Sequence, residues 1–361
     1  MDIKTESYVA FSHFLGIGPI KIQAVKKYFG SIENAYKAPV SDLSKVLRIK
    51  LAQDFVDFRK EFDFKSIFKK FKEKNISIIH QENKNFPKNL LNIADPPICI
   101  YVKGDYDSFD FDGKIASVVG TRMPTQYGQK TTKDIVYTLV GAGFSIISGL
   151  ALGIDSIAHS SCLESGGATI AVLGCGVDIV YPSSNKNLYQ EILNNNGLII
   201  SEFPPGMTVL KGLFVARNRL ISALSNAVIV IEGSNRSGSL ITARYAADQG
   251  KDVYAVPGSI SSRMSEAPNL LIKEGAKPII SMEDLIQEFN IGRIKSISKI
   301  DKSKLNKFEK KIIEKLKENA KNTDEILEKQ GKDLPLILQA LTSLEMKGYV
   351  VKGDDGKYSI T

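Results

Sequence analysis

Short apolar runs alternate with amphipathic stretches throughout residues 114–290. Each run is rich in β-branched residues and closes at or near glycine, proline or a polar turn, which is typical of a strand. Helical patterns such as residues 128–143 and 238–250 lie between the runs. Strands that are apolar on both faces and alternate with helices indicate an α/β domain with a doubly wound, mainly parallel sheet. The runs are KIASVVG, GFSIISG, ATIAVLG, GLIISEF, NAVIVIE and DVYAVPG.

Residues 1–80 are predicted to be all-helical, and their clearest part is LGIGPIKIQAVKKYFGS. Gly16-Ile17-Gly18 predicts a tight turn, Pro19 suits the first helical position, and Gly30 suits the end of that helix. The segment resembles a SAM or helix-hairpin-helix domain, in which hairpin amides and the nearby Lys21 hold a backbone phosphate. An equal alternative is a small helical domain that uses the turn for packing, because LRIKLAQDFVDFRK lacks a second glycine hairpin.

The end of the chain predicts a linker and a third domain. Residues 291–305 are polar and rich in lysine, as expected of a linker. Residues 306–361 then read as helices followed by strand, Asp-Gly turn and strand, which is the outline of a winged helix. Its presumed recognition helix, LPLILQALTSLEMKG, is nearly uncharged. This favours packing or protein contact over direct readout of DNA.

Composition narrows the choice of partner and compartment. The chain has 361 residues, of which 43% are hydrophobic and 24% charged, as in ordinary folded proteins. A formal charge of +8 favours a polyanionic partner. The three cysteines lack CxxC spacing, so neither a disulfide framework nor a zinc cluster is predicted. Since no signal peptide or membrane-length apolar run is recognisable, we expect a cytoplasmic protein that does not enter a membrane.

Residues 211–242 carry the features most suited to a nucleic-acid strand. Lys211, Arg217 and Arg219 bring positive charge to a predicted helix, and Phe214 brings a flat apolar ring. The turn Ser237-Gly238-Ser239 brings backbone amides to the start of the next helix.

A second polar turn, Gly120-Thr121-Arg122, follows the first core strand. Its glycine permits close approach of a ligand and its arginine offers a planar fork to phosphate. The alternative is that Arg122 pairs with a carboxylate at the sheet edge.

Other polar residues carry weaker hypotheses. Asp155, His159 and Cys162 share one helical face and could hold a metal, but a capping aspartate, a hydrogen-bonded histidine and a core cysteine are favoured. Glu202 and Glu232 could form a catalytic carboxylate pair, although nothing in the sequence fixes their separation. The chain lacks a complete GxGxxG, a Walker A loop, a GxSxG elbow and an HExxH motif. No cofactor and no metal are therefore expected.

Seven motifs follow one another across the central domain: VVGTR, SGLALGIDSIAH, GCGVDIVYP, SEFPPG, FVARNRLISALS, EGSNRSGSLITA and AVPG. In this order they resemble the DprA/Smf family of DNA-processing proteins. The resemblance implies an extended Rossmann-like domain over residues 81–290 that binds single-stranded DNA without a cofactor and without catalysis. It also implies a homodimer that protects incoming single strands during natural transformation and loads the RecA recombinase onto them.

The resemblance also assigns DNA contacts. The arginine of the family's Gly-Ser/Thr-Arg motif falls on Arg122, and its DNA-contacting lysine and phenylalanine fall on Lys211 and Phe214. The same pocket is expected to include Gly120, Thr121, Asn218, Arg219, Ser237, Gly238 and Ser239, with Lys186 and Lys251 as rim contacts. One departure is Ala267-Pro268-Asn269, where the family pattern has a glycine.

Two rival functions belong to other classes. Related Rossmann-like enzymes release ribose phosphate from nucleotides. In such an enzyme Arg122 and the Ser237–Ser239 turn would hold a nucleoside monophosphate, with Glu232 as the general acid or base. The basic, aromatic helix start at Lys211–Arg219 argues against this reading, because a mononucleotide does not need it. A purely protein-binding adaptor is the third alternative.

Overall fold

The computed structural model divides the chain into two compact units, residues 1–293 and residues 294–361. Most of the predicted linker lies outside the described residues, which are 2–289, 291, 305–316, 321–327, 334–346, 349–352 and 356–360. Each unit is treated by itself.

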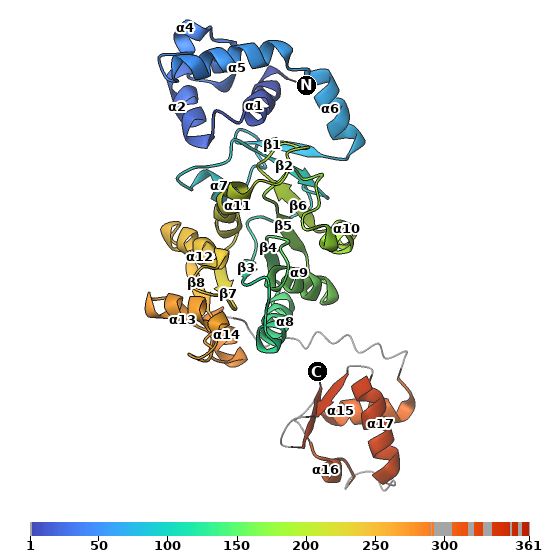
Figure 1. Ribbon diagram of the computed structural model, residues 1–361. Helices are drawn as coiled ribbons and strands as arrows, with labels where there is room; N and C mark the ends of the chain where they lie inside the picture. The colour runs from blue at the N-terminus through green and yellow to red at the C-terminus, as the bar shows by residue number, and fades with distance from the viewer. Residues whose placement is uncertain are drawn as a thin grey trace. The chain divides into compact units, whose positions relative to one another are not determined.

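The first unit is built on a nine-stranded sheet with the order β1-β2-β6-β5-β4-β3-β7-β8-β9 (Figure 1). All neighbouring strands in the part β6-β5-β4-β3-β7-β8-β9 are parallel, as predicted. In contrast, β2 runs antiparallel to both β1 and β6. The six predicted runs form β3 to β8. The strands are β1 Ser77–His80, β2 Cys99–Lys103, β3 Ile115–Val119, β4 Ser145–Ser148, β5 Thr169–Val172, β6 Leu198–Ser201, β7 Ala227–Val230, β8 Asp252–Ala255 and β9 Lys277–Pro278.

Helices cover both faces of the sheet, which explains why its central strands are apolar on both sides (Figure 1). One face is covered by α8 Gln126–Gly141, α9 Ile154–Glu164 and α10 Lys186–Asn194, and the other by α11 Lys211–Ala223, α12 Gly238–Asp248 and α13 Glu266–Lys273. The short α14, Met282–Glu288, packs against α8. The unexpected Ala267-Pro268-Asn269 lies in the first turn of α13, where the Ala267 amide donates to the Gly233 carbonyl at 2.8 Å.

The N-terminal helices share an apolar core with the β1–β2 side of the sheet. Tyr8, Phe11 and Phe55 from the helices and Tyr101 from β2 belong to one buried cluster. Residues 77–80, predicted to be helical, instead form β1, because they pair with β2 and extend the sheet. The helices are α1 Ile3–His13, α2 Pro19–Phe29, α3 Ile32–Lys37, α4 Val40–Leu43, α5 Ile49–Glu61 and α6 Phe64–Glu73, and α7 Lys88–Leu91 follows β1.

The predicted glycine hairpin has the expected ends. Pro19 opens α2, and Gly30 closes it with a φ of 76°. A side chain at Gly16 would meet the Leu51 side chain at 2.7 Å, so the hairpin packs tightly against α5. This contact supports the interpretation that the turn serves packing. The ammonium of Lys21 donates to the Gly16 carbonyl at 3.0 Å, so this lysine bonds the turn itself.

The second unit has its own small core. Its elements are α15 Lys307–Leu316, α16 Thr323–Leu327, α17 Leu334–Met346, β10 Val350–Lys352 and β11 Tyr358–Ile360. The two strands are antiparallel. Ile337, Leu341 and Leu344 on the nearly uncharged α17 are buried in one cluster with Ile312 of α15. One apolar face of α17 therefore packs in this unit, whereas Leu334, Leu336 and Leu338 are exposed.

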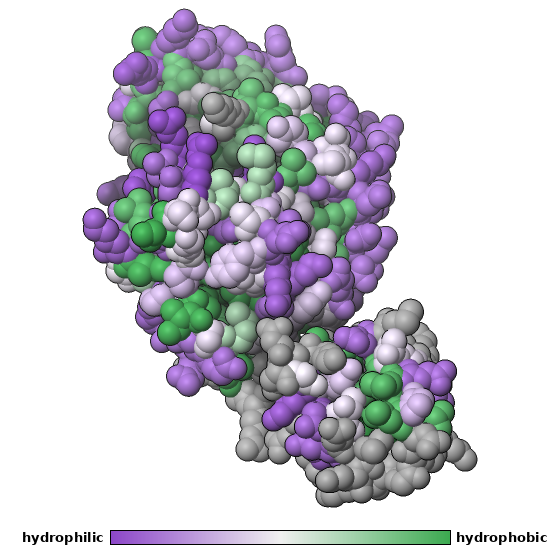
Figure 2. Space-filling model, turned by 60° about the horizontal axis from the view of Figure 1, so that its bottom comes forward, coloured by the Kyte–Doolittle hydropathy of each residue, from purple (hydrophilic) through white to green (hydrophobic). Residues whose placement is uncertain are grey.

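The surface and the cysteines place few further constraints on function. Hydrophilic side chains cover most of the face seen in Figure 2, with small apolar patches between them. None of the helices in the described ranges combines the length and the apolar character needed to cross a bilayer. Cys99, Cys162 and Cys175 are buried free thiols.

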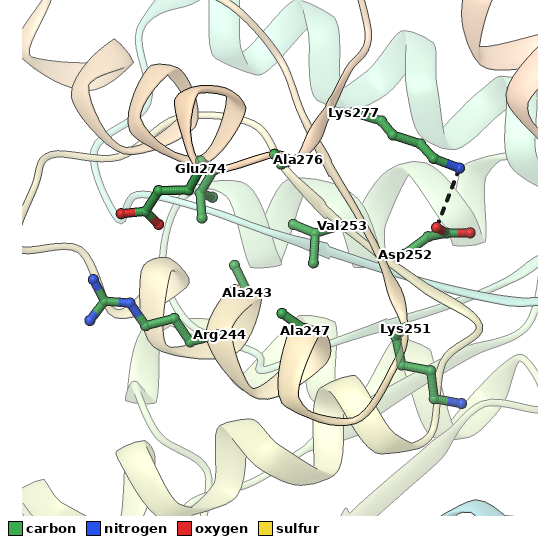
Figure 3. Close-up of a pocket in the computed structure, with 11 residues that line it drawn as sticks. Ala243, Arg244, Ala247, Lys251, Asp252, Val253, Glu274, Ala276 and Lys277 are labelled. Atoms are coloured by element: carbon green, nitrogen blue, oxygen red, sulfur yellow. Dashed lines mark ion pairs between the residues drawn. The ribbon is translucent and has the colours of Figure 1, made fainter.

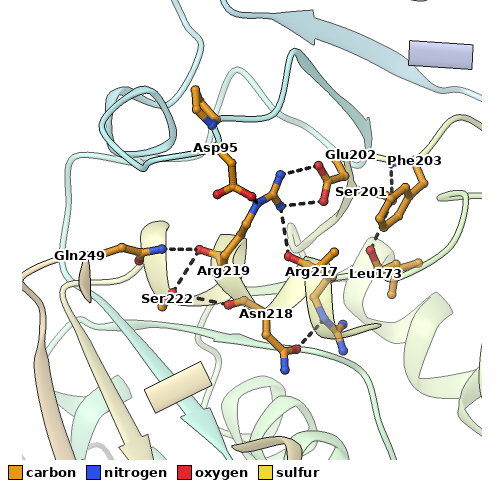
Figure 4. Close-up of polar contacts among 12 residues, drawn as sticks. Asp95, Leu173, Ser201, Glu202, Phe203, Arg217, Asn218, Arg219, Ser222 and Gln249 are labelled. Carbon is orange, nitrogen blue, oxygen red and sulfur yellow. Dashed lines mark hydrogen bonds and ion pairs between the residues drawn. The ribbon is translucent and has the colours of Figure 1, made fainter. Parts of the chain in front are cut away.

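A buried ion cluster fixes α11 to the sheet (Figure 4). The guanidinium of Arg219 donates through both terminal nitrogens to the Glu202 carboxylate at 2.7 Å and through Nε to Asp95 at 2.8 Å. Only 2% of Arg219 is exposed. Burial alone would lower the pKa of Arg219, but the two carboxylates reverse this and hold it above its usual value.

His159 is buried in α9 and has a partner of its own. Its Nδ1 lies 2.7 Å from Thr169 Oγ1. Burial, reinforced by repulsion from Arg217, lowers the pKa of His159 to about 3. Asp155 accepts from the amides of Gly149 and Ala151, and Cys162 lies 3.3 Å from the Ala168 carbonyl.

We expect Arg219→Ala to lower the free energy of unfolding by about 3–5 kcal/mol, because it leaves Glu202 buried without its partner. Urea denaturation at neutral pH measures this change. Arg244→Ala, at an exposed position on α12, is the matched control and should change stability by no more than about 0.5 kcal/mol. A loss below about 1 kcal/mol for Arg219→Ala would contradict a structural role for the cluster.

The low pKa of His159 predicts acid sensitivity. Because the folded state keeps this ring neutral, its contribution is present above the ordinary pKa of about 6.5 and is lost as the pH falls toward 3. Urea titrations of the wild type and His159→Gln between pH 7 and 4 compare the two slopes. As the pH falls, the free energy of unfolding of the variant should decrease less steeply than that of the wild type, by up to about 1.4 kcal/mol per pH unit. Parallel curves for the two proteins would refute this assignment.

Candidate nucleic-acid groove

A groove of about 700 Å³ opens at the carboxyl ends of β3 and β7. Successive crossovers lead away from this point in opposite directions, from β3 through β4 on one side and from β7 through β8 on the other. Such a reversal leaves a crevice that is the usual ligand site of an open α/β sheet. Eight of the predicted residues line the groove: Gly120, Thr121, Arg122, Phe214, Asn218, Ser237, Gly238 and Ser239.

The turn after β3 is tightly constrained on its inner side. A side chain at Gly120 would meet Ile154 at 2.7 Å and the Glu232 carbonyl at 2.9 Å. Gly153, with a φ of 78°, packs against the backbone of this turn. Arg122 projects from the turn with an exposed side chain. It forms no ion pair with any residue that the structure describes, so the alternative of a carboxylate-paired arginine gains no support.

Two aromatic rings form one wall of the groove. The ring centroids of Phe214 and Tyr181 are 5.4 Å apart. Phe214 is half-buried and Tyr181 is 42% exposed, so both rings keep accessible surface. A side chain at Gly174 would meet Phe214 at 2.9 Å, so this glycine admits the start of α11. Tyr181 belongs to the GCGVDIVYP motif but was not among the predicted DNA contacts.

Arg217 lies beneath the aromatic wall and was not among the predicted contacts. It is 5% exposed, and its guanidinium donates to the carbonyls of Gly149, at 2.8 Å, and Val172. Its Cζ lies 6.0 Å from the centroid of the Phe214 ring. Burial lowers the pKa of Arg217 to about 10, which still leaves it protonated at neutral pH. Asp155 opposes that shift, as expected from an opposite charge near the groove floor.

The opposite wall is the start of α12. The Ser237 hydroxyl caps this helix by accepting from the Ser239 amide at 3.3 Å, and the two hydroxyls lie 2.8 Å apart. Asn218 connects the two helices, since it accepts from Arg217 Nε at 3.2 Å and donates to the Gly238 carbonyl at 3.3 Å. Arg236 also lines the groove and is exposed, although sequence reasoning missed it within the NRSGS turn.

Three predicted contacts do not line this groove. The structure corrects Arg219, whose guanidinium is committed to the buried cluster with Glu202 and Asp95. It also corrects Lys251, because this residue directly precedes β8, at the amino end of that strand, and lines a separate pocket (Figure 3). Lys186 begins α10 and is exposed, but it is not a lining residue. The side chain of Lys211, the first residue of α11, lies outside what the structure describes.

The two glutamates of the hypothetical catalytic pair have separate structural partners. Glu202 binds Arg219, as described above. Glu232 is buried and accepts from the hydroxyl and the amide of Thr125, the residue that caps α8, at 2.6 and 2.9 Å. Neither carboxylate lines the groove. Asp155 is the acidic residue found in its lining.

Comparison with known proteins agrees with this geometry. The Smf protein of Synechocystis is 38% identical over 283 residues, which cover 77% of this chain and 71% of that protein. The DNA processing protein DprA of Streptococcus pneumoniae is 44% identical over 204 residues, or 56% of this chain and 71% of that protein.

Solved structures show the same relationship. The X-ray structure of Streptococcus pneumoniae DprA matches with a TM-score of 0.69 at 33% identity, covering 80% of this chain and 98% of that one. A structure of Helicobacter pylori DprA, described for its single-stranded DNA binding mode, matches with a TM-score of 0.54 at 34% identity, covering 60% and 95%. The model of the DNA recombination-mediator protein A family matches residues 77–290. The chain therefore belongs to the DNA recombination-mediator protein A family, whose relatives carry the names DprA and Smf.

Proposed function

We propose that this protein binds single-stranded DNA in the groove at the carboxyl ends of β3 and β7, as a DNA-processing protein of natural transformation. The observation that carries the proposal is the convergence of exposed Arg122 and Arg236 with the rings of Phe214 and Tyr181 in one groove. Cations and accessible rings together suit a strand with unpaired bases. The single-stranded DNA binding described for the Helicobacter pylori relative supports the same reading.

Each wall of the groove has a distinct role in this proposal. Arg122 and Arg236 neutralise phosphates, which makes the affinity fall as the salt concentration rises. Phe214 and Tyr181 stack on bases, and each stacked base contributes about 1–3 kcal/mol whatever its identity. The amides at the start of α12 donate to one phosphate next to the Ser237 cap. Lys211 adds a further cation at the start of α11.

Arg217 acts in this proposal from below the strand. Because its guanidinium is buried and bonded to backbone carbonyls, it supplies a fixed positive charge without reaching into the solvent. Its position near Phe214 also holds that ring in place. None of these contacts reads the edge of a base, so binding is independent of sequence.

Further roles follow from the family resemblance. We infer that the protein acts in the cytoplasm as a homodimer, protects incoming single strands and loads RecA onto them, without a cofactor and without catalysis. Among the described residues of the second unit, three helices followed by two antiparallel strands fit a winged helix within residues 306–361. We retain the segmentation into residues 1–80, 81–290, 291–305 and 306–361 as part of this proposal.

The rival nucleotide-hydrolysing enzyme is less well supported by the geometry. Its presumed general acid or base, Glu232, bonds Thr125 at the start of α8 and lies outside the groove lining. Incubation with nucleoside monophosphates and detection of free base distinguishes the two functions. The adaptor alternative predicts no salt-sensitive binding of oligonucleotides.

We expect Arg122→Ala to weaken the binding of a short single-stranded oligonucleotide about tenfold, and Phe214→Ala to weaken it by about 1–3 kcal/mol. Fluorescence anisotropy across a salt series measures both effects. Arg122→Ala should also flatten the dependence of affinity on salt by roughly 0.7 in the logarithmic slope, because one phosphate contact is lost.

Arg244→Ala is the control for charge. It removes an exposed arginine from the same unit, away from the groove, and should leave affinity unchanged. Thermal unfolding checks that each variant is folded. Equal affinity of the wild type and Arg122→Ala for single strands, with both proteins folded, would overturn the groove assignment.

A further inference from the structure

The positive charge of the protein is concentrated outside the domain that carries the groove. Residues 1–76 contain 15 Lys and Arg against 9 Asp and Glu, a formal charge of +6. Residues 77–293 contain 18 Lys and Arg against 20 Asp and Glu, a formal charge of −2. A long polyanion bound only at the groove would therefore leave most of the cationic surface of the first unit unused.

Much of this charge lies on α6. Ile67, Phe68 and Phe71 of the helix pack into the core that the N-terminal helices share with β2, and the ring of Phe64 contacts the ring of Phe68. Its four exposed lysines, Lys65, Lys69, Lys70 and Lys72, form what is here called the α6 lysine surface. Lys69 approaches Glu73 at 3.9 Å, with both side chains largely exposed. The other three form no ion pair with any described residue.

The carboxyl end of α6 touches the loops that continue into the groove. Lys74, next after the helix, forms an ion pair with Asp178 at 2.6 Å, and Asp178 in turn accepts from the Gly206 amide at 2.8 Å. A hollow of about 530 Å³ lies here, lined by Lys70 of α6 and by Gly206 of the loop before α11.

The two loops connect this hollow to the groove within a few residues. Asp178 precedes the groove residue Tyr181 by three positions, and Gly206 precedes the groove residue Val209 by three. Three residues of extended chain span no more than about 11 Å. This hollow, which is also lined by Lys74 and by the carboxylates of Glu73 and Asp178, and the aromatic wall are thus neighbouring parts of one surface.

We propose that the α6 lysine surface is a second contact site for the strand bound in the groove, and that it binds the phosphates that follow the stacked bases. This inference rests on the proposed function of the groove. It assigns to the N-terminal helices an electrostatic role in holding long single strands, whereas short strands are held by the groove alone. Mobile lysines suit this role, because a flexible backbone passing over them needs charge and no fixed geometry.

Binding as a function of strand length tests the proposal. The full chain is compared with Lys65→Gln/Lys70→Gln/Lys72→Gln. The oligothymidylates have about 6 nucleotides, within the usual site size of one single-strand binding domain, and about 25, beyond it. The triple variant should bind the short strand like the wild type and the long strand about tenfold more weakly. Its logarithmic salt slope for the long strand should fall by roughly 2, since three phosphate contacts are lost.

The matched control, Lys114→Gln/Lys133→Gln/Lys273→Gln, removes the same charge from exposed lysines that line neither the groove nor the hollow. It should bind both strands like the wild type. Thermal unfolding and light scattering establish that both triple variants keep the fold and the oligomeric state of the wild type. These measurements exclude altered bridging between two copies as the cause of a length effect.

The possible failures of the two proposals are separate. Unchanged affinity and salt slope for the long strand in the α6 variant would overturn the second contact site, and would point to an acidic protein as the partner of these lysines. Equal weakening of the long strand by the α6 and control variants would also overturn it, because charge alone would then be responsible. Retention of short-strand binding by Arg122→Ala would instead overturn the groove itself, and the α6 proposal with it.

Discussion

The groove depends on the close packing of α11 against the sheet. Two arginines, only two residues apart, fix this helix in different ways. Arg217 reaches the carbonyls of Gly149 and Val172 at the carboxyl ends of β4 and β5, and Arg219 binds the carboxylate of Glu202 at the end of β6. Both guanidiniums are buried, so every donor that lacked a partner would be costly. The position of Phe214 in the aromatic wall follows from these bonds.

Glycines in the turns after β4 and β5 allow α11 to pack closely against the sheet. A side chain at Gly149 would meet the Arg217 guanidinium within 2.7 Å, and one at Gly174 would meet Phe214 at 2.9 Å. The glycine-rich turns after β4 and β5 thus serve to admit the side chains of α11, whereas in a dinucleotide site such turns admit a pyrophosphate. This difference explains how a sheet with the form of a nucleotide-binding domain can carry glycine-rich turns without a complete nucleotide motif.

The sequence predicted the parallel part of the sheet well, because fully buried strands give continuous apolar runs that end at glycine or polar turns. Eight residues named as DNA contacts line the groove: those of the turns after β3 and β7 lie there because the carboxyl ends of parallel strands meet at one edge, whereas Asn218 was named through the family resemblance. The strand β1 was missed, because the half-exposed Ser77–His80 has no continuous buried run. Arg219 and Lys251 were also placed among the DNA contacts, although neither lines the groove. A positive charge in the sequence does not reveal its partner. The carboxylates that bind Arg219 lie 17 and 124 residues away along the chain. The different partners of Arg217 and Arg219 follow from the orientation of α11, which the sequence does not give.

The net charge of this protein is unevenly distributed along the chain. The formal charge of +8 suggested a polyanionic partner, yet the domain with the groove is slightly acidic. Two of its arginines, Arg217 and Arg219, are buried in hydrogen bonds, whereas Arg122 and Arg236 are exposed at the groove. Under the proposed function, we expect a groove with few exposed cations to bind a strand mainly through stacking and fixed donors, which respond weakly to salt. Strong salt dependence for long strands would then have to originate in the lysine-rich flanks, where cations are exposed and remain hydrated until a phosphate approaches.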